Sequence, residues 1–222
     1  MLRSVAPDHS GSDVPRQRRG FLRGAAGCRE AQQSGRTGVD APSGAGESGT
    51  AAPAENGWPV RLYRTLKAAG IGHMSYVPDA GHTALIKLLE ADPAVICNVL
   101  TTEEEGIAIA AGAWLGGQRS VLLMQSSGVG NCINMLSLPA IGRFPLLMLV
   151  TMRGEWAEFN PWQVPMSRAT QPTLEAMGVR VMRAEAPEDL VETVEAAAAL
   201  AFEADGQVAV LLGQRLLGRK KW

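Results

Sequence analysis

Two spacings of apolar residues alternate along the chain from Trp58 onward. Segments in which apolar residues recur every three to four positions are separated by short continuous apolar runs, the first typical of helices and the second of buried strands. Gly, Pro and charged residues mark most of the boundaries between them. The pattern predicts helices over 59–69, 82–92, 103–116, 131–143 (broken or bent at Pro139), 171–177 and 187–204, and strands over 73–78, 94–100, 120–125, 144–152, 179–183 and 207–213.

This alternation predicts a doubly wound α/β fold. The strand segments are continuously apolar, as expected when helices cover both faces of a sheet. Strands that alternate with helices favour a mainly parallel sheet, here of about six strands with helices on both faces. One such domain is expected over residues 58–222, with an irregular loop at 153–167.

Residues 1–57 differ from the rest of the chain. They are rich in Gly, Ser, Ala, Pro and Arg and show no apolar periodicity. Such a segment cannot bury enough apolar surface to offset its ordering entropy, so a disordered tail is predicted. The stretch RRGFLRGAAG (18–27) is similar to a twin-arginine export signal, but the apolar region that export requires does not follow it. A chance match is the better interpretation, and a misassigned start codon would also explain the tail.

Composition and charge narrow the class of protein. The net charge of −1 over 222 residues provides no general attraction to nucleic acid or to anionic membranes. Hydrophobic residues make up 46% of the chain and aromatic residues only 5%, a mixture that suits tightly packed α/β layers. The longest apolar run is far shorter than the roughly 20 residues of a membrane-spanning helix. Cys28, Cys97 and Cys132 have no metal-binding spacing, so we expect free thiols in a reducing, cytoplasmic compartment and no metal site.

Ligands of such sheets bind at the carboxyl ends of the strands, near the switch in strand order. The stretch QSSGVGN follows a strand and combines Gln125, Ser126, Ser127 and Asn131 with two glycines. Glycines permit the close approach of a ligand to backbone amides. The third glycine of the dinucleotide-binding fingerprint is missing, and no lysine follows as it would in a P-loop. An ordinary tight turn between strand and helix is the alternative.

Two other strand ends carry polar residues. Arg153 follows the most apolar strand, where its planar guanidinium can bind a carboxylate, sulfonate or phosphonate. A surface ion pair with Glu155 or Glu158 is an equal alternative. Asp79 and His82 follow the first strand, and His82 can act as an acid or base near neutral pH. An ordinary loop histidine is the default interpretation.

Three consecutive glutamates, Glu103, Glu104 and Glu105, precede a helix made almost entirely of small and apolar residues. Acidic residues in a first turn complement the helix dipole by roughly 0.3–1 kcal/mol each, and Thr101 or Thr102 can cap the helix. These effects account for all three glutamates without a ligand. A helix of this composition must be buried, however, so a first-turn glutamate lies near dry surroundings, where it can share a proton with a ligand.

Three segments carry a resemblance to a known family: TTEEEGIAIAAGAWLGG (101–117), VLLMQSSGVGNCINML (121–136) and IGRFPLLMLVTMRGE (141–155). In order and spacing they resemble the pyrimidine-binding domain of thiamine diphosphate enzymes, and within that class the sulfopyruvate decarboxylase alpha subunits and the N-terminal part of the phosphonopyruvate decarboxylases. The likeness covers roughly residues 60–212, the whole of the predicted folded body.

The resemblance implies a mechanism. In the family, a glutamate at this helix start hydrogen-bonds N1′ of the aminopyrimidine and so promotes its imino tautomer. The imino tautomer deprotonates C2 of the thiazolium, and the resulting carbanion attacks the keto group of a 2-oxo acid. Counting nine positions back from Gly112 matches that glutamate to Glu103, with Glu104 and Glu105 as the alternatives if the alignment slips. The residues that match the family's loop beside the pyrimidine and substrate are Gln125, Ser126, Gly128 and Asn131.

The resemblance also implies a substrate class and a partner. Arg153 matches an arginine of the family, and its inferred role is to bind the distal anion of the substrate. Asp79 and His82 lie in a turn that looks longer than the family's and that is expected near the reacting centre. The GDG motif and later Asn that hold the diphosphate through Mg²⁺ are missing, so we expect a separate beta subunit to supply them. The expected reaction is decarboxylation of 3-sulfopyruvate or 3-phosphonopyruvate to the corresponding acetaldehyde and CO2.

Three alternatives remain open from the sequence alone. The chain can be a subunit of an acetolactate-synthase-like carboligase, or a non-catalytic α/β subunit with a binding or regulatory role. A nucleotide-binding Rossmann domain is disfavoured because the third glycine of its fingerprint is missing.

Overall fold

The computed structural model describes residues 57–218. The tail predicted at 1–57, with its twin-arginine-like stretch and Cys28, lies outside the described residues apart from Gly57, and so do residues 219–222. Within the described part, Cys97 and Cys132 are free thiols, as predicted.

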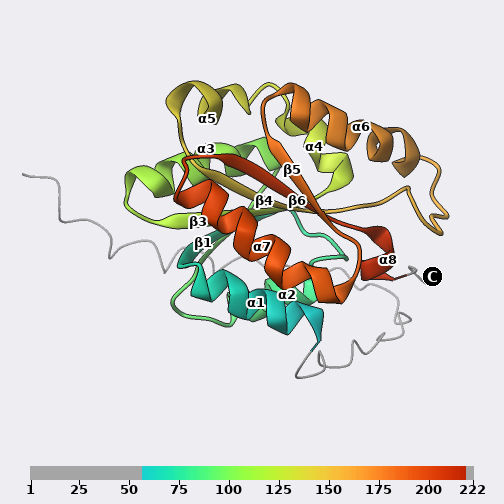
Figure 1. Ribbon diagram of the computed structural model, residues 1–222, viewed down its shortest axis with the longest axis horizontal. Helices are drawn as coiled ribbons and strands as arrows, with labels where there is room; N and C mark the ends of the chain where they lie inside the picture. The colour runs from blue at the N-terminus through green and yellow to red at the C-terminus, as the bar shows by residue number, and fades with distance from the viewer. Residues whose placement is uncertain (1–56, 219–222) are drawn as a thin grey trace, which may run out of the picture. The chain divides into compact units, whose positions relative to one another are not determined.

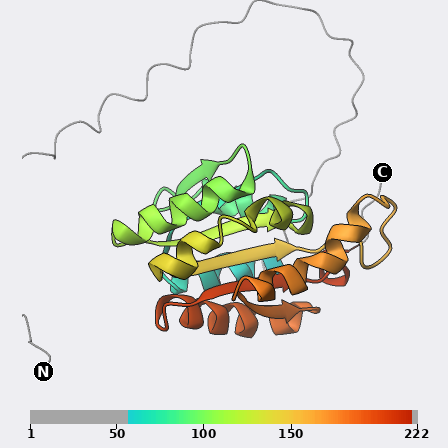
Figure 2. The same cartoon turned by 90° about the horizontal axis from the view of Figure 1, so that it is seen from above.

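Six parallel strands form one sheet in the order β2-β1-β3-β4-β6-β5, which confirms the predicted parallel sheet. Figure 2 shows the strand row with β2 at one edge and β5 at the other. The chain leaves β1 for β2 on one side and then returns to β3 on the other side, so the switch in strand order lies between β1 and β3. The strands are β1 (Ile71–Tyr76), β2 (Ile96–Val99), β3 (Arg119–Gln125), β4 (Leu146–Thr151), β5 (Arg180–Ala184) and β6 (Gln207–Leu212).

Helices cover both faces of this sheet, as predicted for a doubly wound fold (Figure 1). One face packs against α1, α2 and α7, and the other against α3, α4 and α6, with α5 beside α3. The helices are α1 (Trp58–Ala68), α2 (Thr83–Glu90), α3 (Glu103–Leu115), α4 (Ser126–Cys132), α5 (Ser137–Gly142), α6 (Gln163–Ala176), α7 (Pro187–Phe202) and α8 (Gln214–Leu217).

The small residues of α3 let this helix pack unusually close to the sheet. A Cβ atom added at Gly106 would come closer than 3.0 Å to side-chain atoms of Leu122 on β3 and of Leu100. Ile107 and Ala110 are buried on the same side. Since real Cβ atoms do not approach so closely, only glycine permits this spacing, and α3 therefore places its first turn directly beside the carboxyl end of the sheet.

Three details of the predicted elements are wrong. The strand predicted at 94–100 is an edge strand and is not fully buried, because Ile96 and Val99 are 51% and 64% exposed. The helix predicted over 131–143 is interrupted at 133–136 and not at Pro139, which occupies the first turn of α5, where its missing N–H costs nothing. Helix α6 begins at Gln163, eight residues before the predicted start, and contains Pro172 in its interior.

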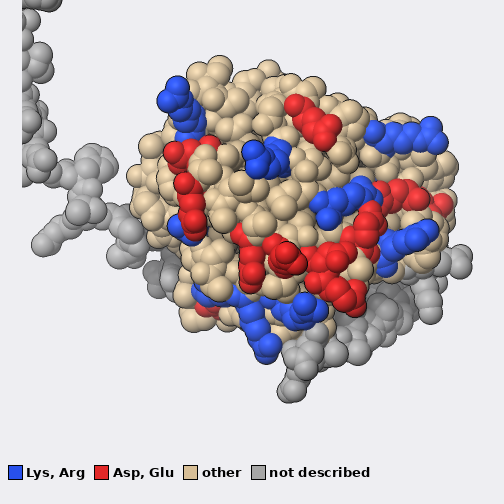
Figure 3. All heavy atoms as spheres, viewed as in Figure 1, with Lys and Arg blue, Asp and Glu red and all other residues tan. Residues whose placement is uncertain are grey.

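Charged side chains of both signs share the face of the molecule drawn in Figure 3, which is the face seen in Figure 1. Acidic side chains form a band on this face, part of which is the acidic first turn of α7, and basic side chains lie on either side of the band. In the described part of the chain, no helix has the length and apolar character needed to cross a membrane.

Candidate functional site

The Glu103 side chain is held in a tight setting between α3 and α4. Its carboxylate is nearly buried, with the residue 8% exposed, and Oε2 accepts a 2.8 Å hydrogen bond from Nδ2 of Asn131. A Cβ atom at Gly128 would come closer than 3.0 Å to Oε1, Cδ and Cγ of Glu103, so the carboxylate lies against bare backbone. Within residues 57–218, this bond to Oε2 is the one side-chain hydrogen bond of Glu103, so Oε1 is left without a partner. The structure thus brings together three of the predicted cofactor-binding residues and leaves one carboxylate oxygen available to a ligand.

The other two glutamates have different surroundings. Oε2 of Glu105 accepts a hydrogen bond from the backbone N–H of Thr101, which stabilises the start of α3. Thr102 occupies the N-cap position without a side-chain capping bond, so the predicted threonine cap is wrong and a glutamate reaches back instead. Glu104 has one buried carboxylate oxygen with no partner in the described part of the chain. The three acids that the sequence presents alike therefore occupy three distinct environments.

Two of these carboxylates, those of Glu103 and Glu104, act on the thiol of Cys132. Burial raises the pKa of its thiol, and the neighbouring charges of Glu103 and Glu104 raise it further, to about 12. The thiol is therefore protonated at neutral pH and packs as a small apolar group in the core between the sheet and the α3 and α4 side.

The predicted glycine-rich turn is instead the helix α4 itself. Gln125, the last residue of β3, is the N-cap residue, and α4 begins at Ser126. Nε2 of Gln125 donates a 2.7 Å hydrogen bond to Oγ of Ser127. The buried Oγ of Ser126 accepts a 3.1 Å hydrogen bond from the backbone N–H of Arg153. Gln125 and Ser126 therefore lie between the Glu103 group and a second group of residues at the ends of β1 and β4.

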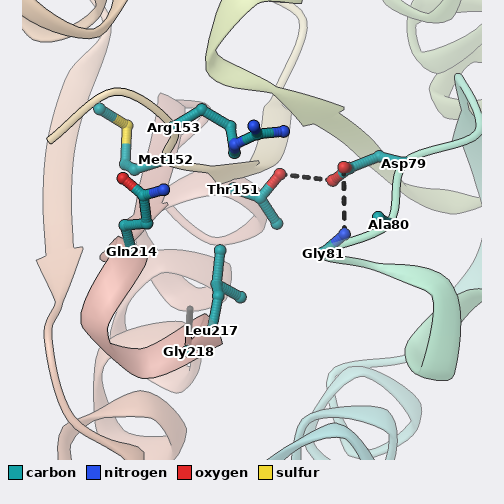
Figure 4. Close-up of a pocket in the computed structure, with 9 residues that line it drawn as sticks. All are labelled: Asp79, Ala80, Gly81, Thr151, Met152, Arg153, Gln214, Leu217 and Gly218. Atoms are coloured by element: carbon teal, nitrogen blue, oxygen red, sulfur yellow. Dashed lines mark hydrogen bonds between the residues drawn. The ribbon is translucent and has the colours of Figure 1, made fainter. Parts of the chain in front are cut away.

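This second group surrounds a small pocket of about 110 Å³ (Figure 4). Figure 4 shows Arg153 and Thr151 on one side, the loop after β1 with Asp79 on the other, and α8 below. Of the predicted substrate residues, Asp79 and Arg153 line the pocket, whereas His82 lies behind it. The residues that line it are Asp79, Ala80, Gly81, Thr151, Met152, Arg153, Gln214, Leu217 and Gly218.

Asp79 is an ionised group in this pocket. Its Oδ2 accepts a hydrogen bond from the hydroxyl of Thr151, and its Oδ1 accepts one from the backbone N–H of Gly81. Burial by itself would raise the pKa of Asp79, but His82 and these hydrogen bonds outweigh burial and lower the pKa to about 2 from 3.8. His82 is fully buried, with Nδ1 3.2 Å from Oδ2 of Asp79 but without hydrogen-bond geometry, and its Nε2 has no partner in residues 57–218. The histidine predicted as a loop residue is thus a buried neighbour of Asp79.

The lowered pKa of Asp79 predicts a pH-dependent contribution to stability. Because the pKa in the folded state lies below the ordinary value of 3.8, the ionised carboxylate stabilises the fold above about pH 4, and this stabilisation is lost as the pH falls toward 2. We expect Asp79→Asn to lower the free energy of unfolding by roughly 2 kcal/mol at pH 7. Urea unfolding at pH 7 and pH 3 checks this prediction: the gap between variant and wild type should narrow at pH 3, and an equal gap at both values would contradict it.

The Arg153 guanidinium is paired with Glu158, one of the two partners considered from the sequence. Nε and Nη2 of Arg153 each donate a 2.7 Å hydrogen bond to the carboxylate of Glu158, and the two side chains are 12% and 4% exposed. The Arg153 guanidinium, acting against burial, lowers the pKa of Glu158 to about 2. Nη1 of Arg153 donates a 3.3 Å hydrogen bond to Oε1 of Gln125. The ion pair is therefore built into the structure and is not a loose surface contact.

Gln214 is a site residue that the sequence interpretation missed. It is buried at the start of α8, and its Oε1 accepts hydrogen bonds from the backbone N–H groups of Glu155 and Trp156. Its Nε2 donates a 3.0 Å hydrogen bond to Glu158. The available signal was its position two residues after the end of β6, because polar residues that follow parallel strands gather at one edge of the sheet.

The described residues contain no group of three or more His, Cys, Asp or Glu side chains that could hold a metal ion. The polar groups at the carboxyl edge comprise one available carboxylate oxygen on Glu103 and the amide of Asn131. A separate pocket beside them is lined by the charged residues Asp79 and Arg153. Such an arrangement can accept or hold a proton on a bound organic group and can orient that group against α4.

Comparison with known proteins identifies solved structures with a similar fold and relatives with a similar sequence. A solved structure from Mycobacterium smegmatis, described as that of a thiamin diphosphate-dependent enzyme, matches with a TM-score of 0.58 at 15% identity over 75% of this chain and 33% of that chain. The sulfopyruvate decarboxylase subunit alpha of Methanothermobacter thermautotrophicus is 36% identical over 152 residues, which are 68% of this chain and 92% of the relative. The phosphonopyruvate decarboxylase of Streptomyces viridochromogenes is 39% identical over 98 residues, 44% of this chain and 25% of the relative. No protein-family model matches the sequence.

The fold is therefore that of a domain found in thiamin diphosphate-dependent enzymes. The extent and identity of the sequence match define the family more narrowly: the chain belongs to the sulfopyruvate decarboxylase alpha subunits. The predicted family and the predicted enzyme class, a decarboxylase, are confirmed. The matches favour this interpretation over a carboligase or a non-catalytic subunit.

Proposed function

We propose that this chain is the pyrimidine-binding alpha subunit of a thiamine diphosphate-dependent decarboxylase that acts on 3-sulfopyruvate or 3-phosphonopyruvate. The observation that carries the proposal is the setting of Glu103, which is nearly buried and held by Asn131 over Gly128 with one carboxylate oxygen available. Its family relatives support 3-sulfopyruvate as the first substrate to test, because the match to sulfopyruvate decarboxylase alpha subunits spans 92% of a relative's length.

The chemistry of the residues around Glu103 fits contact with an aminopyrimidine nitrogen, because one carboxylate oxygen is held by Asn131 and the other is left for a ligand. The carboxylate of Glu103 would hold a proton at the pyrimidine nitrogen N1′, and Asn131 would keep that carboxylate in place through Oε2. Gly128 leaves room for the carboxylate, and Gln125 and Ser126 form the adjoining edge of the site. When bound, thiamine diphosphate supplies the electron sink that makes loss of CO2 from a 2-oxo acid possible.

The substrate side of the site is assigned to the loops that follow β1 and β4, which carry Asp79, His82 and Arg153. Asp79 and Arg153 line the pocket at the ends of β1 and β4, and the buried His82 lies against Asp79. The strand order supports this assignment for Asp79 and His82, since the loop after β1 flanks the switch point at which ligands of doubly wound sheets bind.

The proposal requires a second subunit. Relatives of this chain are named alpha subunits, which implies that a partner subunit exists for them. We propose that a beta subunit supplies the diphosphate-binding domain with its Mg²⁺, so that the complete site lies between the two chains. The acids of the described residues form no metal-binding cluster of their own.

A substrate screen tests the proposal. The full chain is purified together with its beta subunit and incubated with thiamine diphosphate and magnesium across a series of 2-oxo acids. We expect CO2 and sulfoacetaldehyde from 3-sulfopyruvate, or the phosphono analogue from 3-phosphonopyruvate, at rates well above that for pyruvate. Formation of acetolactate from pyruvate would identify a carboligase instead, and an assembled complex that decarboxylates none of the acids would refute the proposal.

A further inference from the structure

The loop 153–160 is organised around the carboxylate of Glu158. This carboxylate accepts two hydrogen bonds from Arg153, one from Gln214 and two from backbone N–H groups of the loop, those of Gly154 and Asn160. The Glu158 side chain is only 4% exposed. A ligand anion would have to displace this network to take the place of Glu158 at the guanidinium.

The remaining polar contacts of Arg153 are directed toward the start of α4. Nη1 donates to Oε1 of Gln125, and the backbone N–H of Arg153 donates to Oγ of Ser126. The guanidinium carbon lies 5.8 Å from the centre of the Phe159 ring. Gln125 in turn donates to Ser127 in the first turn of α4. A continuous chain of hydrogen bonds therefore runs from Glu158 through Arg153 and Gln125 into α4.

The charges around the pocket disfavour direct recognition of a substrate anion by Arg153. The carboxylates of Asp79 and Glu158 both have a pKa of about 2 and are ionised at neutral pH. The charges of Glu158 and Asp79 both act on Arg153 and help to raise the pKa of its guanidinium. One guanidinium faces two carboxylates, so an added sulfonate or phosphonate would meet no excess of positive charge there.

We propose that Arg153 is a positioning residue: clamped by Glu158, it orients Gln125 and the first turn of α4 and does not grip the distal anion of the substrate. Helix α4 also carries Gly128 and Asn131, so the alignment of this helix sets the position of the Glu103 carboxylate. This proposal rests on the proposed function for its kinetic consequences, but its structural part can be measured without turnover.

Hydrogen exchange of the full-length chain tests the structural part. Arg153→Met is compared with Arg183→Met, because Arg183 pairs with Glu155 in the same loop and with Glu185 but has no contact with Gln125. We expect amide exchange in residues 124–132 to be at least about fivefold faster in Arg153→Met and unchanged in Arg183→Met. Equal exchange in the two variants would overturn the proposal.

Kinetics of the complex with the beta subunit test the consequence for the reaction. For a positioning residue, Arg153→Met lowers kcat by the same factor with 3-sulfopyruvate and with pyruvate, and adding Gln125→Ala causes little further loss. A rise in KM confined to 3-sulfopyruvate would show direct recognition of the anion and overturn the proposal. A wild-type complex inactive on every 2-oxo acid would refute the proposed function, whereas the exchange experiment would still decide the role of Arg153.

Discussion

Replacing Glu103 by glutamine should lower decarboxylation by about 10²–10⁴-fold while the complex with the beta subunit still assembles. The glutamine side chain has nearly the same shape, and its Oε1 can still accept the hydrogen bond that Asn131 donates. An amide cannot take up and return a proton as a carboxylate does, so the variant removes the proposed chemistry at N1′ and preserves the packing against Gly128.

Glu105→Gln is the matched control for this variant. Glu105 lies two residues further along the same helix turn, and its carboxylate accepts a hydrogen bond from the backbone N–H of Thr101. Its variant should turn over 3-sulfopyruvate at close to the wild-type rate. Near-normal turnover by Glu103→Gln, purified with its partner, would refute the assignment of Glu103, and a large loss in Glu105→Gln alone would move the assignment to Glu105.

Gly128→Ala should disable the site by a steric route. The added methyl group would come closer than 3.0 Å to three atoms of the Glu103 side chain, which Asn131 and its own burial prevent from moving freely. Displacing a catalytic group by about 1 Å can cost roughly 10²-fold in rate, and we expect a loss of that order. Overpacking at such a contact should also lower the free energy of unfolding by about 1–3 kcal/mol.

Gly130→Ala provides the control in the same helix. A Cβ atom there would meet only the sulfur of Met166, at 3.4 Å, an ordinary contact distance. Activity should remain close to that of the wild type, and urea unfolding should show no loss of stability, because alanine is favoured over glycine in a helix. If the two variants lose activity equally, the effect at Gly128 comes from α4 in general and not from the contact with Glu103.

The sequence predicted the fold well because the strands of a covered parallel sheet are continuous apolar runs that differ clearly from helical spacing. The prediction was wrong where contacts with neighbouring elements determine the exposure of a strand or the extent of a helix. The exposure of Ile96 and Val99 depends on β2 being an edge strand, which its apolar composition does not reveal. Pro172 lies inside α6, where local rules predict a break, so packing against the sheet outweighs the local preference there.

In the candidate site, too, the sequence predicts where residues lie but not the contacts that their side chains make. Helix-start energetics treat Glu103, Glu104 and Glu105 alike, and the spacing from Gly112 in the family resemblance selects Glu103. The contact of α3 with α4, between residues 28 apart in sequence, gives Glu103 surroundings that the sequence does not show. The sequence likewise leaves open whether Glu155 or Glu158 pairs with Arg153, and the structure shows that Glu158 does. Strand-end position identified the right edge of the sheet, but it could not supply the side-chain contacts that give each residue its role.

The most direct test of the central claim is the exchange of the C2 proton of thiamine diphosphate for deuterium, measured by quenched-flow NMR in the complete complex without substrate. This measurement isolates cofactor activation from substrate binding and product release. The role proposed for Glu103 predicts rapid exchange in the wild-type complex and exchange about 10²-fold slower or more in Glu103→Gln, with the cofactor still bound. Exchange at the same rate in both complexes would contradict that role.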